Sequence, residues 1–206
     1  GAISNDANHI SGPSRTGDGL YLAIRQAMEE AAVLAEDVSF MNTHGTATVY
    51  NDEMESKAIH LAGLETVPVH SLKSYFGHTL GASGVIESII CIHELKENVL
   101  FGTLGYEKPG VSMPILVQAD HQEIPMKHCI KTASGFGGCN AAIVLTLPAY
   151  QKQPSSVQSP VTVHTTATVS IENSCLSMNG ETVFSSSASN FAQFIREAYK
   201  NTGGSN

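Results

Sequence analysis

Hydrophobic residues along the first 150 positions of the chain follow two different patterns. In some stretches they recur at every third or fourth position, which predicts amphipathic helices, and in others they form short continuous runs, which predict buried strands. The apolar residues of segment 84–98 cover most of the circumference of a helix, which predicts a helix buried on nearly all sides. In chain order, the predicted elements are helices over 20–35, 52–62 and 84–98, and strands over 38–43, 67–71, 113–119, 128–134 and 140–147.

This alternation of strands and helices is typical of a layered α/β domain, in which helices cover a sheet. The pattern then changes: a polar stretch with two prolines and no periodicity predicts a linker. Beyond it, short alternating runs surround Asn179-Gly180, a pair typical of hairpin turns, and segment 189–201 has the spacing of a small amphipathic helix. The sequence therefore predicts a main domain over 1–148, a linker over 149–160 and a hairpin-helix extension over 161–206.

Composition argues against several classes of function. Of the 206 residues, 42% are hydrophobic and 15% charged, and the formal net charge of −8 argues against binding to nucleic acid, although Lys127, His128 and Lys131 form a small basic group. No apolar run reaches the roughly 18 residues of a membrane span, and no secretory leader opens the chain. The four cysteines and nine histidines have no metal-site spacing. We expect a reduced cytoplasmic protein without a metal.

Three short motifs carry candidate chemistry, although each alone has an ordinary structural explanation. His44, in the turn HGTAT, is a candidate proton donor or a polar residue at a strand end. The small residues of GHTLGASG (77–84) are also suited to close helix packing, and GFGG (135–138) is a common kind of turn between strands. Glu87 lies among isoleucines of a predicted helix, where an unpaired carboxylate would be costly, so we predict that it pairs with Lys73.

Taken in order, these motifs resemble those of the β-ketoacyl synthases, the condensing enzymes of fatty-acid and polyketide synthesis. The residues that carry the resemblance are NTHGTATVYNDEME (42–55), KSYFGHTLGASGVIE (73–87) and SGFGGCN (134–140). The resemblance covers residues 1 to about 148 and is to the C-terminal half of the family's proteins. It implies the C-terminal half of a thiolase-like, layered α-β-α-β-α fold, followed here by a small β-hairpin and helix.

The resemblance also implies a reaction. Family members join an acyl group to a malonyl unit on an acyl carrier protein, with loss of carbon dioxide. The phosphopantetheine arm of the carrier protein enters as substrate, and no cofactor is bound. The implied catalytic positions are His44 and His78, beside Lys73 and Glu87. Neutral imidazoles that donate hydrogen bonds to the thioester oxygen would stabilise the enolate left by decarboxylation, and Lys73 is expected to keep His78 neutral.

Further positions follow from the same resemblance. Thr46 and Thr48 are expected to hold the pantetheine arm. Phe136, flanked by Gly135 and Gly137, matches an aromatic gate beside the family's nucleophile, and the two glycines would let that loop move. For Asp52 and Glu55, a structural role at the start of a helix is expected rather than a chemical one.

The family's nucleophilic cysteine lies upstream of every motif found here, and none of the four cysteines matches it. The chain alone is therefore not expected to form an acyl-enzyme, and an N-terminal half is the expected partner. Without that half, the helix over 84–97 would expose an apolar face, which predicts that the chain self-associates.

Three alternatives stay open. The chain could be a non-catalytic subunit, of chain-length or scaffold type, in a condensing complex; the intact set His44, Lys73, His78 and Glu87 argues against this. A thiolase-type acyltransferase fits the three motifs less well. A metal-binding protein is the most distant alternative, because the histidines are scattered.

Overall fold

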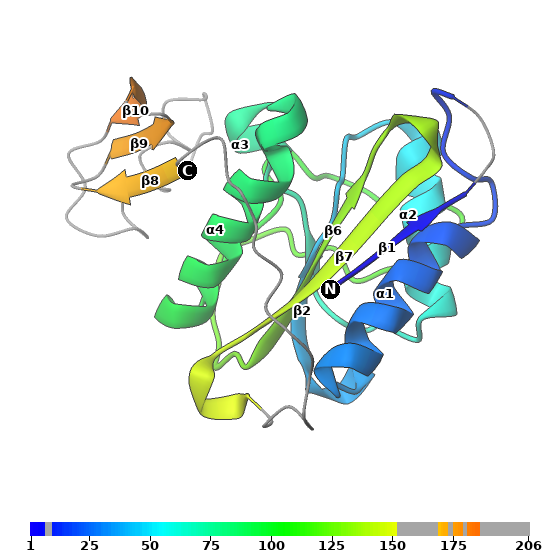
Figure 1. Ribbon diagram of the computed structural model, residues 1–206, viewed down its shortest axis with the longest axis horizontal. Helices are drawn as coiled ribbons and strands as arrows, with labels where there is room; N and C mark the ends of the chain where they lie inside the picture. Colours follow the sequence, from blue (N-terminus) through cyan, green and yellow to red (C-terminus); the bar gives the residue numbers. More distant parts are fainter. Residues whose placement is uncertain (7–9, 152–168, 173–174, 179–180, 186–206) are drawn as a thin grey trace, which may run out of the picture. The chain divides into compact units, whose positions relative to one another are not determined.

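The computed structural model describes residues 1–6, 10–151, 169–172, 175–178 and 181–185. The chain divides into two compact units, residues 1–151 and 152–206, and each is considered by itself (Figure 1). Among the described residues, no helix combines the length and apolar character needed to cross a membrane.

The first unit is built on a five-stranded mixed sheet with strand order β1-β7-β6-β2-β3. Strand β2 runs parallel to both of its neighbours, β3 and β6, whereas β7 runs antiparallel to β6 and to β1. The strands are β1 (Ala2–Asn5), β2 (Val38–Asn42), β3 (Val69–His70), β6 (His128–Ser134) and β7 (Cys139–Thr146), and a separate pair is formed by β4 (Val99–Leu100) and β5 (Gln122–Glu123).

Helices cover both faces of the sheet, α1 and α2 on one side and α4 on the other (Figure 1). The helices are α1 (Asp18–Ala31), α2 (Val49–Leu61), the short α3 (Lys73–Phe76) and α4 (Ser83–Glu97). Single 3-10 turns span η1 (Ala35–Asp37), η2 (Leu80–Ala82), η3 (Phe136–Gly138) and η4 (Pro148–Tyr150). The layered α/β class predicted from the sequence is confirmed.

Two hydrophobic clusters form because successive residues of a strand point to opposite faces of the sheet. Met41 and Ile130 pack with residues of α1 and α2, while their chain neighbours Phe40 and Cys129 pack with residues of α4. The central strands β2 and β6 are thus buried on both faces, which explains their continuous apolar runs.

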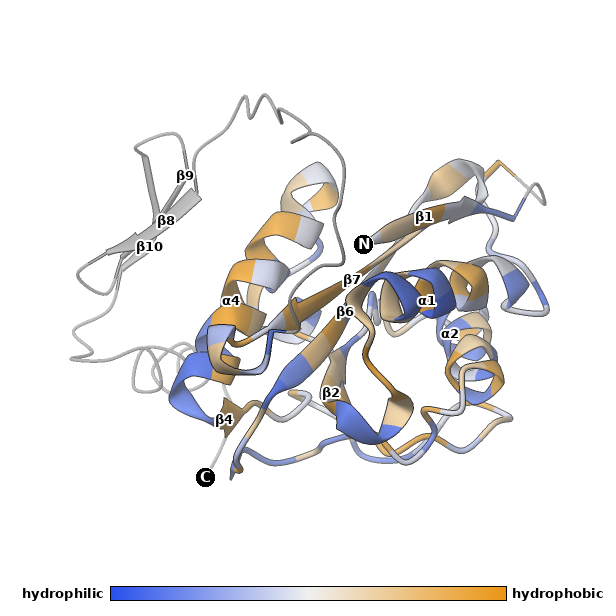
Figure 2. Ribbon diagram, turned by 60° about the horizontal axis from the view of Figure 1, so that its bottom comes forward, coloured by the Kyte–Doolittle hydropathy of each residue, from blue (hydrophilic) through white to orange (hydrophobic). Residues whose placement is uncertain are grey.

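Helix α4 is not buried on nearly all sides, and that prediction was wrong for this chain. Ile86, Ile90 and Leu95 are buried against the sheet, but Val85 is 54% exposed and Ile92 37%. Figure 2 shows α4 coloured hydrophobic over most of its length. The helix therefore carries a second apolar side, as expected if it normally lies between two layers.

Two further differences concern strands. Residues 2–5 pair with β7 as β1, although no strand was predicted there. Segment 113–119, predicted as a strand, makes only an isolated bridge between Val117 and Val69. Pro114 lacks the N–H that a continuous ladder would use, and the pairing is limited to bonds between Val69 and the backbone of Leu116 and Gln118.

In the second unit, the described residues form a three-stranded antiparallel sheet with order β10-β9-β8. Its strands are β8 (Val169–Glu172), β9 (Cys175–Met178) and β10 (Glu181–Ser185). The pairing of β9 with β10 agrees with the hairpin predicted around 179–180. The predicted linker beyond 151 and the predicted helix over 189–201 lie outside the described residues.

Candidate active site

The loop that carries His44 leaves the carboxyl end of β2 and is held by one buried carboxylate. Glu55 of α2 accepts hydrogen bonds from the backbone N–H groups of His44 (2.8 Å) and Gly45 (2.7 Å), and from the side-chain amide of Asn51 (2.7 Å). Gly45 has φ +46°, and a Cβ there would lie 2.5 Å from that of Ser71. Glu55 therefore has a structural role, although not at the start of the helix as expected: it holds the backbone of the loop that carries His44.

His78 follows α3 and is exposed, whereas His44 is buried. The centroids of the two rings are 5.0 Å apart and their planes meet at 81°. The N–H of Leu80 donates a hydrogen bond to Nδ1 of His78 at 3.1 Å. Because Nδ1 accepts, the single proton of the neutral ring lies on Nε2, which leaves Nε2–H as a hydrogen-bond donor.

Glu87 of α4 lies between two lysines in a buried cluster. Its Oε1 is 2.7 Å from Nζ of Lys73, as predicted, and its Oε2 is 2.7 Å from Nζ of Lys131. Lys131 also donates to the carbonyl of Thr132. Burial alone would raise the pKa of Glu87, but the charges and hydrogen bonds of Lys131 and Lys73 lower it. Burial lowers the pKa of Lys73, and its hydrogen bond and charge pairing with Glu87 act in the opposite direction.

The buried site also changes the pKa of His44. Burial lowers the pKa of His44 first, and the positive charges of Lys73 and Lys131, with a smaller effect from His78, bring it to about 3. His44 is therefore a neutral imidazole at physiological pH. The lysine effect that the sequence suggested for His78 is found at His44.

The other predicted site residues lie on loops at the same edge of the sheet. Since β2, β3 and β6 are parallel, their carboxyl ends lie together, and the loops after them contain His44, Lys73 and Phe136. The hydroxyls of Thr46 and Thr48 are 2.9 Å apart. Phe136 is 81% exposed.

The loop that holds Phe136 is anchored on both sides by backbone groups. The N–H of Gly137, which has φ +80°, donates to the carbonyl of Ile10 at 2.6 Å, and its own carbonyl accepts from the side chain of Asn5 at 3.0 Å. Gly135 donates to the carbonyl of Cys139 at 2.8 Å. The exposed phenyl ring thus projects from a fixed turn.

Lys131 is the site residue that sequence reasoning missed, because it was considered only as part of a basic group with Lys127 and His128. A signal was available: Lys131 interrupts an apolar strand whose neighbours are buried on both sides. A lysine in such a strand needs a carboxylate partner, and Glu87 had already been identified as a buried carboxylate.

Comparison with known proteins identifies the family. Residues 1–107 match the model of the beta-ketoacyl synthase C-terminal domain. The chain belongs to this family. It is 35% identical over 147 residues to the 3-oxoacyl-[acyl-carrier-protein] synthase 2 of Vibrio harveyi, a match that covers 69% of the chain and 35% of that protein. The chain thus spans about a third of the length of the curated relatives it matches.

Solved ketosynthase structures share the fold. A β-ketoacyl synthase from Burkholderia phymatum matches with a TM-score of 0.66 and 30% identity, over 70% of this chain and 36% of that one. A ketosynthase in complex with its chain length factor, from Xenorhabdus doucetiae, matches with a TM-score of 0.67 and 30% identity, over 71% and 37% of the two chains. The thiolase-like fold inferred from the motifs is therefore confirmed.

We predict that His44 stays neutral at pH 5 in the folded chain, because its pKa is lowered from 6.5 to about 3. The imidazole nitrogens can be followed by two-dimensional proton–nitrogen NMR, with His44→Gln to assign the signals. Since the unfolded chain binds this proton more readily, the contribution of His44 to stability is complete above pH 6.5 and falls as the pH drops toward 3.

The role of the lysine cluster can be measured in the same titration. Lys131→Met removes one of the charges that lower the pKa of His44, so that pKa should rise. Lys127→Met, at an exposed position on the approach to the same strand, is the matched control and should leave it unchanged. A His44 that titrates near 6.5 in the unchanged chain would contradict the assignment.

Proposed function

We propose that this chain is the C-terminal portion of a 3-oxoacyl-[acyl-carrier-protein] synthase, which catalyses the decarboxylative condensation of an acyl group with a malonyl unit on a carrier protein. The observation that carries the proposal is the pair of rings, His44 and His78, 5.0 Å apart. The carrier protein as partner is supported by the name of the Vibrio relative.

In this proposal both histidines donate hydrogen bonds to the malonyl thioester oxygen. When carbon dioxide leaves, the electron pair of the broken C–C bond forms an enolate, and negative charge collects on that oxygen. A neutral donor suits this step, because it stabilises the developing charge without first having to lose or gain a proton. The low pKa of His44 and the Nε2–H of His78 both support such a role.

Lys73, Glu87 and Lys131 position and polarise this pair. The two lysines hold Glu87 ionised and keep positive charge beside the place where the enolate oxygen forms. Thr46 and Thr48 would bind the phosphopantetheine arm through their adjacent hydroxyls, and Phe136 would gate the entry of the acyl chain from its turn between Gly135 and Gly137. No resident cofactor is needed for any of these steps.

The nucleophile that accepts the acyl group is proposed to be a cysteine outside this chain, on an N-terminal half. Of the cysteines in the described residues, Cys91 and Cys129 are buried between α4 and the sheet, and Cys139 follows the Phe136 turn. None of the three begins a helix, where a thiolate is favoured. The chain by itself is therefore proposed to be inactive in condensation.

A non-catalytic subunit of chain-length type is the second candidate, because a solved relative pairs a ketosynthase with a chain length factor. The two candidates differ in what they require of His44. A subunit without chemistry has no need for a buried neutral imidazole beside two lysines.

An assay of carbon dioxide release by the whole protein, supplied with an acyl donor and malonyl-carrier protein, distinguishes these two candidates. His44→Ala and His78→Ala should each slow carbon dioxide release about 100-fold or more, since each removes one donor to the enolate oxygen. His60→Gln, on α2 against the carbonyl of Pro114, is the control and should keep the rate. Unchanged rates in both alanine variants would favour the non-catalytic subunit.

We also propose that the apolar outer side of α4, formed by Val85, Ile89 and Ile92, is the surface on which the N-terminal half packs. The chain spans about a third of the length of its relatives. Val85 and Ile92 are exposed and Ile89 is half-buried, and apolar side chains exposed together are typical of an interface. In the isolated chain, a second copy would take the place of the missing half.

Self-association of the isolated chain should therefore be seen as a dimer or larger species by light scattering. Val85→Glu combined with Ile92→Glu should yield monomers, because each glutamate places a charge in the contact. Leu34→Glu, at another exposed apolar position, is the control and should not dissociate the assembly. A monomeric unchanged chain that binds no hydrophobic dye would refute this proposal.

A further inference from the structure

Three potential metal ligands meet in the interior, between the sheet and α4. They are His70 at the end of β3, and Cys91 and Glu94 on α4, and their ligand atoms all lie within 4.8 Å of one another. Nε2 of His70 is 3.4 Å from Oε2 of Glu94, and both side chains are fully buried. The spacing of the three residues along the chain gave no sign of this group.

The surroundings of these ligands are apolar. Phe40, Leu95 and Leu100 belong to the same buried cluster as Cys91, and the ring of Phe40 lies 5.5 Å from that of His70. A carboxylate in such a place is costly unless it is neutralised. The backbone N–H of Phe101 donates to Oε1 of Glu94 at 3.0 Å, which accounts for only one of the two oxygens.

Several polar atoms of the group have no hydrogen-bond partner. They are Nδ1 of His70, Oε2 of Glu94 and Oδ1 of the adjacent Asn42, all fully enclosed. Buried polar atoms are nearly always satisfied in folded proteins, so the unsatisfied Oε2 of Glu94 points to a group that completes it. This oxygen faces Nε2 of His70 at 3.4 Å, and both atoms are of ligand type.

We propose that His70, Cys91 and Glu94 bind a zinc-like divalent transition-metal ion. Imidazole nitrogen, thiolate sulfur and carboxylate oxygen are the donors that zinc accepts in tetrahedral sites. The thiol of Cys129 hydrogen-bonds with that of Cys91. Since all three residues are buried, a substrate in solvent has no access to the ion, and we infer a structural site.

The position of the site gives it a consequence for the proposed catalytic residues. His70 lies three residues before Lys73, and Glu94 lies two helical turns after Glu87 on the same helix. A bound ion would connect the end of β3 to α4, the two segments that lead to the ion pair of Lys73 and Glu87. This site is separate from the proposed condensation chemistry and does not depend on it.

The test uses the full chain in a Cys139→Ser/Cys175→Ser background, which leaves Cys91 and Cys129 as the only thiols among the four cysteines. Metal-free protein is titrated with cobalt(II), and zinc(II) is then added in competition. One equivalent of cobalt should bind with the charge-transfer absorption of a thiolate–cobalt bond, and one equivalent of zinc should remove it.

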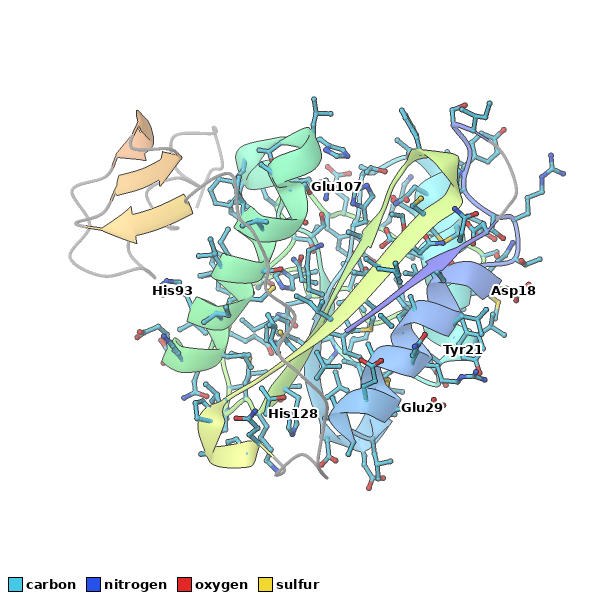
Figure 3. All side chains as sticks on the ribbon, viewed as in Figure 1. Asp18, Tyr21, Glu29, His93, Glu107 and His128 are labelled. Atoms are coloured by element: carbon cyan, nitrogen blue, oxygen red, sulfur yellow. The ribbon has the colours of Figure 1, made fainter. Side chains whose placement is uncertain are left out.

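Variants then assign the ligands. Cys91→Ser and Glu94→Gln should each weaken cobalt binding at least about tenfold, the loss usual even for residues that only support a ligand. His93→Gln is the matched control on the outer side of α4 (Figure 3) and should bind as before.

Three outcomes would overturn the proposal. One is a background protein that binds no cobalt at one equivalent, and another is binding without a thiolate band. The third is a band that persists unchanged in folded Cys91→Ser. The first two outcomes are measured on the background protein, in which all proposed ligands are present. The proposal therefore stays testable even where a ligand variant fails to fold.

Discussion

The buried carboxylate of Glu87 is the group around which the active-site end of this domain is organised. A single negative charge in an apolar interior must be compensated, and here two lysines from different elements compensate it, Lys73 from α3 and Lys131 from β6. The contact fixes α4 against the sheet and at the same time places Lys73 and Lys131 near His44. One electrostatic requirement thus governs a packing arrangement and adds to the burial that lowers the pKa of His44.

The topology of the sheet explains why these residues can meet. Three parallel strands end at one edge, and each is followed by a loop that carries a polar residue. Glu55, two turns into α2, accepts hydrogen bonds from the backbone N–H groups of the first of these loops. These main-chain hydrogen bonds position His44. The antiparallel return through β7 then fixes the glycine-rich turn at the same edge.

Much of this arrangement could be predicted from the sequence, because it depends on local patterns. The helices α1, α2 and α4, strands β2 and β6, and the Lys73–Glu87 pair follow from periodicity and from the cost of a buried charge. β1 could not be predicted, because a strand of four residues with one buried side chain has no period to detect. Segment 113–119 is the opposite case: its apolar run predicted a strand, but only Val117 forms a bridge.

The residues that the sequence did not reveal are those whose role depends on contacts between distant segments. Lys131 lies 44 positions from Glu87, its ion-pair partner. His70 meets Glu94 across the space between β3 and α4. Patterns within a short stretch of sequence do not reveal contacts between distant segments. Only the expectation that buried polar groups need partners indicates such contacts.

The hydrogen bond from Leu80 to His78 has a consequence for how the family can vary. The donor is a backbone N–H, so every amino acid except proline supplies it at position 80. Leu80 has φ +52°, a conformation that glycine and asparagine adopt readily and β-branched residues do not. Substitution by glycine or asparagine therefore keeps the tautomer of His78, whereas a tautomer fixed by a side-chain partner would be lost with one substitution. The path of the backbone, rather than the identity of a neighbouring side chain, thus maintains the proton on Nε2 of His78.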